Sequence, residues 1–120
     1  MKDVEVSSEW YQSVFDCKSM HGGSEFDILT TENNEVFLCL HKWGEHDHPS
    51  MQSAGNSNGN GLILYFRTEN LDRIRENLRK MDYDVEKEIE LNPNSHKMEF
   101  SLRDPDGYYI TIAEYHTYKG

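Results

Sequence analysis

The sequence predicts an α+β fold in which two similar modules together form one domain. Apolar and polar residues alternate in several short runs, which is the period of β-strands. Two other segments carry apolar residues at spacings of three and four, which is the period of helices. The same order of elements occurs twice, each copy spanning roughly 50 residues, and such a repeat indicates a duplicated structural unit.

Residues 1–44 form the first module, which is incomplete. Ser7 or Ser8 is the expected N-cap of a helix whose apolar stripe runs from Trp10 to Phe15. A short strand is expected near residues 17–20. Two further strands, residues 26–31 and 35–43, flank a turn at residues 32–34.

Residues 45–60 are predicted to be a linker or a lid. They contain the Gly- and Asn-rich run GNSNGNG, and the segment is too long for a hairpin turn. His46 and His48 lie at its start, beside Glu45 and Asp47. A pair of histidines two residues apart in an acidic loop is a weak metal-binding signal, and a solvated or lid segment is the competing interpretation.

Residues 61–120 form the second module. A strand at residues 61–68 precedes a helix at residues 71–81 with Asn70 as its N-cap. Strands follow at residues 85–91, 98–103 and 109–115, the last two joined by the turn Asp104–Gly107. The module therefore reads strand, helix, strand, strand, strand. The first module has the same order without the opening strand. That gap predicts either a partner chain covering the sheet edge or a natural chain that begins upstream of Met1.

Composition excludes several classes of partner. Twelve basic and 22 acidic residues give a net charge of −10, which disfavours nucleic acid and anionic membrane surfaces. The sequence contains no long apolar run and no signal-peptide core, so a cytoplasmic location is expected. Two cysteines, Cys17 and Cys39, are expected to be free thiols in a reducing compartment.

Three segments resemble the vicinal-oxygen-chelate superfamily, also called the glyoxalase, bleomycin-resistance and extradiol-dioxygenase fold. They are SSEWYQSVF, LYFRTENLDRIRENL and FSLRDPDGYYITIAEY, and the RDPDG turn with its following strand is the most specific. The resemblance implies paired βαβββ modules whose mixed sheets curl into a half-open barrel around a small-molecule cavity. It also implies a homodimer.

Metal-dependent members of this family hold a divalent ion with His, Gln or Glu side chains on the concave face. Carried onto this chain, the position late in the first module falls on Cys39, and the two positions of the second module fall on Ile63 and Thr111. The remaining position belongs to the missing opening strand. Because a divalent ion needs three or four converging donors, no cofactor is expected. Glu114 is a weak substitute for the missing metal-binding carboxylate, since strand alternation places its side chain on the side of Ile110 and Ile112, away from Thr111.

Strand parity divides the side chains into a helix-facing set and a cavity-facing set. The cavity set combines aromatic walls with a few polar groups, which is typical of a small-ligand pocket. Trp43, at a strand end, is a candidate for stacking on the ligand. The predicted ligand-binding residues are Phe37, Cys39, His41, Trp43, Ile63, Tyr65, Arg67, Glu99, Ser101, Tyr109 and Thr111.

These residues leave two functions open. The first is a binding protein that sequesters a small molecule without a metal ion. The second is a lyase, isomerase or dioxygenase of the same superfamily, with displaced metal ligands or with His41 and Glu99 as an acid–base pair. Arg67 and Glu99 have a competing interpretation as a structural ion pair, and Cys39 as a small buried apolar residue.

Overall fold

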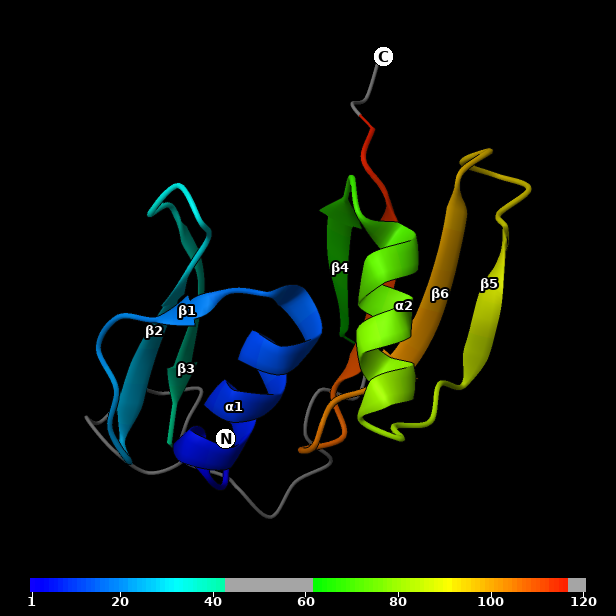
Figure 1. The fold of residues 1–120 in the computed structure, drawn as a ribbon. Helices are drawn as coiled ribbons and strands as arrows, with labels where there is room; N and C mark the ends of the chain where they lie inside the picture. The colour runs from blue at the N-terminus through cyan, green and yellow to red at the C-terminus, as the bar shows by residue number, and fades with distance from the viewer. Residues whose placement is uncertain (43–61, 117–120) are drawn as a thin grey trace. The chain divides into compact units, whose positions relative to one another are not determined.

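The computed structural model describes residues 1–42 and 62–116, and the chain divides into two compact units, Met1–Asn58 and Gly59–Gly120. The described residues contain one helix in each unit, one sheet of three strands and one of four (Figure 1). Neither sheet closes into a barrel. The predicted α+β class is therefore confirmed. The expected linker, residues 45–60, lies outside the described residues.

The first unit consists of one helix and a three-stranded antiparallel sheet. Its elements are α1 (Val4–Phe15), β1 (Lys18–Ser19), β2 (Phe26–Thr30) and β3 (Val36–His41). The strand order is β1-β2-β3, so β3 forms one edge. Within the described part of the chain, no strand precedes α1, as the sequence indicated.

Helix α1 begins earlier than expected. Asp3 is its N-cap, with extended backbone angles and a carboxylate that accepts a hydrogen bond from the Val6 amide at 3.0 Å. Ser7 and Ser8, the predicted caps, are instead buried within the helix. The cap is therefore one of the acidic residues that precede the apolar stripe. Asp is as good an N-cap as Ser, so the sequence alone did not decide between them.

The Ser8 hydroxyl binds a buried carboxylate that joins α1 to the sheet. Asp27 of β2 is 2% exposed, and it accepts hydrogen bonds from the hydroxyls of Ser8 at 2.5 Å and Ser19 at 2.8 Å. The amides of Gly22 and Ile28 donate to it as well, each at 2.8 Å. Burial alone would raise the pKa of Asp27, but these four donors together lower it below the ordinary value.

A register shift changes the faces of β3. Thr30 pairs with Val36 whereas Leu29 pairs with Leu38, so Phe37 is an extra residue in β3. The Phe37 ring packs against Phe15 of α1, with ring centroids 5.2 Å apart. The prediction that Phe37 faces away from the helix was therefore wrong, because strict alternation does not hold through a bulge.

The second unit consists of one helix and a four-stranded mixed sheet. Its elements are β4 (Ile63–Thr68), α2 (Leu71–Lys80), β5 (Lys87–Leu91), β6 (Met98–Arg103) and β7 (Tyr109–Glu114). The strand order is β4-β7-β6-β5, with β4 and β7 parallel. No register shift interrupts β4, β6 and β7, so their alternation is preserved.

Helix α2 lies against one face of this sheet (Figure 1). Its buried apolar residues and the completely buried residues of β6 and β7 form the core, namely Leu71, Ile74, Leu78, Phe100, Leu102, Ile110 and Ile112. Asn70 precedes the helix as expected, but its side chain makes no capping hydrogen bond. None of the helices in the described residues is long and apolar enough to cross a membrane.

The turn between β6 and β7 is organised by a buried carboxylate. Asp104 is 3% exposed, and its Oδ1 accepts hydrogen bonds from the amides of Asp106 and Tyr108, both at 2.9 Å. Gly107 adopts a φ of 89°, a conformation that disfavours side chains. The turn therefore brings β6 and β7 into antiparallel pairing, as the DPDG motif predicted.

Candidate functional site

The face of the second sheet opposite α2, called the distal face below, carries every predicted site residue of the second unit. Three rows cross the strands in register. They are Ile63, Tyr109 and Arg103; Tyr65, Thr111 and Ser101; and Arg67, Ala113 and Glu99. A direct hydrogen bond of 2.9 Å between the hydroxyls of Ser101 and Thr111 lies within this face. The period-two pattern thus placed these side chains together.

The distal face has an apolar and aromatic part and a polar part. Ile63 is 60% exposed and Tyr65 is 48% exposed, whereas Ser101 and Thr111 are buried. Burial, with a smaller contribution from the charge of Glu99, raises the pKa of the Tyr65 phenol, and Arg67 partly opposes this. Tyr65 therefore stays protonated at neutral pH and can donate a hydrogen bond to a ligand.

In the part of the chain that the structure describes, Arg67 and Glu99 form no hydrogen bond or ion pair with each other. The Arg67 guanidinium donates to the backbone carbonyl of His116 at 2.5 Å and lies 5.0 Å from the ring centre of Tyr115. Glu99 accepts a hydrogen bond from the Asn92 amide. Residue Ala113 of β7 separates the two in the register. The alternative prediction of a structural ion pair was wrong, because the two residues occupy strands that are not adjacent.

Three residues of this face were missed by the sequence interpretation, and one of them is Glu90, which pairs with Glu99. Lys87 of β5 pairs with Ser101, and Arg103 pairs with Tyr109. The Arg103 guanidinium lies 5.2 Å from the Tyr109 ring centre and contacts Glu86 at 3.0 Å. Extending the alternation to the last residue of β6 would have included Arg103. Lys87 would still have been missed, because a register shift between Lys87 and Glu90 breaks the alternation of β5.

The first unit contributes Cys39 and His41 to the β3 face opposite α1. Cys39 is exposed, and pairs with Ile28. The His41 ring packs edge-on against Phe26, its partner in β2, with centroids 5.9 Å apart, and its Nδ1 lies 2.9 Å from the Lys42 carbonyl oxygen. The expectation that Cys39 is a buried apolar residue was wrong. Phe26 and Ile28, which share this face, were missed.

The proposed acid–base pair does not belong to one sheet. His41 lies in the first unit and Glu99 in the second. Trp43, the candidate for stacking on the ligand, and the histidine pair His46 and His48 lie outside the described residues. Their assignments therefore stay predictions.

The residues at the family's metal positions do not fit a metal ion. Ile63 has no donor atom, and the Thr111 hydroxyl is hydrogen-bonded to Ser101. Cys39 alone would offer one soft ligand. Glu114 points away from this face, since its carboxylate accepts a hydrogen bond from the Met98 amide at 3.0 Å. Among the described residues, no group of three or more His, Cys, Asp or Glu side chains is arranged to hold an ion.

Comparison with known proteins identifies the family. The model of the Glyoxalase/Bleomycin resistance protein/Dioxygenase superfamily matches residues 1–112. The chain therefore belongs to this superfamily, which confirms the resemblance inferred from the three sequence segments.

Solved structures share the fold at low sequence identity. VPC_CASS1, from the mobile metagenome of V. pseudocholerae, is 22% identical, with a TM-score of 0.68 over 98% of this chain and 89% of that chain. TioX from Micromonospora sp. ML1 is 13% identical, with a TM-score of 0.75 over 97% and 93%. A lactoylglutathione lyase from Agrobacterium tumefaciens is 14% identical, with a TM-score of 0.65 over 95% and 86%. No curated protein matches the chain.

Proposed function

We propose that this protein binds a small molecule on the distal face without using a metal ion, as a glyoxalase/bleomycin-resistance-like binding protein. The observation that supports this most is the composition of that face. Tyr65, Tyr109 and Ile63 offer apolar and aromatic surface, and Ser101 and Thr111 offer hydroxyls. Pockets for small ligands combine mostly apolar walls with a few polar groups in this way.

The chemistry of the family's metal positions supports the metal-free form of this proposal. The aliphatic side chain of Ile63 cannot coordinate a metal ion. The Thr111 hydroxyl coordinates metal ions poorly and is already hydrogen-bonded to Ser101. A ligand bound here would be held by stacking and hydrogen bonds instead. Tyr65 is the residue that we expect to contribute most, because it is half exposed and carries both an aromatic ring and a donor.

A thermal-shift screen tests this function. Bleomycin and a panel of aromatic compounds are added to protein in EDTA, and separately with Zn²⁺, Ni²⁺ or Mn²⁺. We expect at least one compound to raise the Tm by about 2–4 °C in EDTA, because a ligand that binds only the folded state stabilises it. Tyr65→Ala should abolish this shift. Tyr83→Phe, which changes a tyrosine outside the distal face, is the matched control.

The same samples separate binding from catalysis. Chromatography of each bound compound after prolonged incubation should return it unchanged. A shift that appears only with a divalent ion, or a product formed in its presence, would favour the enzymatic alternative. A shift unaffected by Tyr65→Ala would place the ligand elsewhere.

We also propose that the protein is a cytoplasmic homodimer. Large apolar side chains remain exposed on strands of both units, including Val36 at 67% and Ile63 at 60%. Buried apolar surface is the main driving force of stable association. Light scattering after gel filtration should give twice the 14.1 kDa mass of one chain. A monomer at high protein concentration would contradict the proposal.

A further inference from the structure

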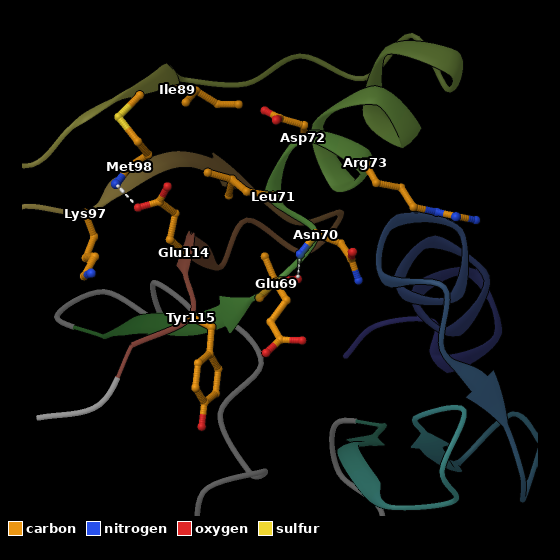
Figure 2. Close-up of a pocket in the computed structure, with 11 residues that line it drawn as sticks. Glu69, Asn70, Leu71, Asp72, Arg73, Ile89, Lys97, Met98, Glu114 and Tyr115 are labelled. Atoms are coloured by element: carbon orange, nitrogen blue, oxygen red, sulfur yellow. Dashed lines mark hydrogen bonds between the residues drawn. The ribbon is translucent and has the colours of Figure 1, made fainter.

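We propose that the second unit has another binding site, for a small organic cation, on the α2 side of its sheet. A cavity of about 820 Å³ lies between the first turn of α2, the middle of β5 and the adjoining ends of β6 and β7 (Figure 2). Ligand cavities commonly measure about 300–1,000 Å³, so the space is sufficient for a small molecule. This site lies on the opposite side of the sheet from the distal face and goes beyond the function proposed above.

A polar bridge joins the helix to β5 beside the cavity. Arg75 of α2 makes a bidentate ion pair with Glu88, with distances of 2.6 Å and 2.9 Å. Toward the start of the helix, the apolar side chains of Leu71, Ile89 and Met98 line a hollow instead of closing it (Figure 2). These three side chains supply the apolar surface that the body of an organic ligand requires.

Three carboxylates line this cavity, and those of Asp72 and Glu114 give it its charge preference, whereas that of Glu69 extends away from them (Figure 2). Asp72 and Glu114 extend from opposite sides of the hollow (Figure 2). The Met98 amide donates to Glu114 Oε2 at 3.0 Å, which fixes the side chain. Within the described residues, Asp72 and the Oε1 atom of Glu114 have no hydrogen bond or ion pair. Each of the two carboxylates thus offers an acceptor on the wall of the same cavity.

The basic residues of the lining do not neutralise these carboxylates. The side chains of Lys97 and Arg73 extend away from Glu114 and Asp72 (Figure 2). The N-terminus of α2 contributes the equivalent of about half a positive charge, which two full negative charges outweigh. An anionic ligand would be repelled. Two carboxylates are also too few donors for a tightly held divalent ion.

An ammonium group attached to an apolar body matches this arrangement. The ammonium would lie between Asp72 and Glu114 and donate to both, while the body would contact Leu71, Ile89 and Met98. A charge-assisted hydrogen bond is about twice as strong as a neutral one, so a cation gains more here than an alcohol of the same shape.

Nuclear magnetic resonance titration with three matched probes tests the site. The probes are 4-phenylbutylamine, 4-phenylbutanol and 4-phenylbutanoate, which share one skeleton and differ in charge. We expect the amine to shift the backbone amide signals of Asp72, Ile89 and Met98, with an affinity about tenfold higher than that of the acid. Signals of Tyr65 and Thr111 on the distal face should stay in place.

Two charge-removing variants and a control complete the test. Asp72→Asn and Glu114→Gln should each weaken the amine about three- to tenfold and leave the alcohol unaffected. Glu76→Gln, which removes an exposed carboxylate from the same helix, should change neither. No shift at about 10 mM amine, equal binding of amine and acid, unchanged affinity in both variants, or shifts confined to the distal face would overturn the proposal.

Discussion

Replacing Asp27 should destabilise the first unit more than any other polar substitution in it. In Asp27→Ala, the partly buried amides of Gly22 and Ile28 lose their acceptor, and a donor left unsatisfied costs about 1–3 kcal/mol when it is shielded from water. The hydroxyls of Ser8 and Ser19 can rotate toward other acceptors, so their contribution is smaller. We therefore expect the free energy of unfolding to fall by about 3 kcal/mol.

Asp27→Asn is the matched control for the charge. The asparagine oxygen can still accept from Gly22 and Ile28, which both donate to Oδ1, while its NH₂ group donates to the serine oxygens. The loss should be only about 1 kcal/mol. Because folding lowers the pKa of Asp27, its charge stabilises the protein above the ordinary carboxyl pKa of about 4. That advantage disappears as the pH falls through the lowered pKa.

Urea unfolding followed by tryptophan fluorescence measures both effects, since Trp10 and Trp43 belong to the first unit. The reasoning would be refuted by a loss below about 1 kcal/mol in Asp27→Ala. It would also be refuted by a difference between wild type and Asp27→Asn that is the same at pH 7 and near pH 2.

Three further predictions concern other parts of the chain. Iodoacetamide should alkylate exposed Cys39 much faster than Cys17 at pH 8, because burial raises the pKa of the Cys17 thiol to about 11. Mass spectrometry of timed samples measures the two rates, and equal rates would contradict the prediction. Asp104→Ala should lower the free energy of unfolding in urea by about 1–3 kcal/mol, because two amides lose their acceptor. Asp104→Asn keeps the accepting oxygen and should lower it far less. Equal losses in the two variants would contradict the role given to that oxygen. Leu78→Ala should cost about 2–5 kcal/mol by the same method because Leu78 is completely buried, and a loss under about 1 kcal/mol would argue against that packing.

The sequence predicted the distal face of the second unit well because no register shift interrupts the alternation of β4, β7 and β6. Each of Ile63, Tyr65 and Thr111 lies on the expected side. The first unit was harder. A bulge at Phe37 reversed the side of one aromatic residue, and no local signal of Gly or Pro marks it.

The cavity beneath α2 could not be predicted from the sequence. Leu71 and Ile89 both read as ordinary core residues, and only the three-dimensional packing shows that space remains between them. The same holds for the buried carboxylate Asp27, which appears in the sequence as a charged residue in an apolar strand. Except for the Ile28 amide, its partners come from helix α1, strand β1 and the loop that follows β1, which no pattern in β2 could identify.

The parallel pairing of β4 with β7 has a consequence for synthesis on the ribosome. Ile63 pairs with Tyr109 and Thr68 with Glu114. The first strand of the second unit therefore cannot pair until the last strand has been synthesised. Pairings between residues so distant in the chain form slowly, because the intervening segment must first be closed into a loop. A nascent chain that stops before Tyr109 would therefore leave the apolar residues of β4 exposed and unpaired. Exposed apolar strands of this kind are bound by chaperones.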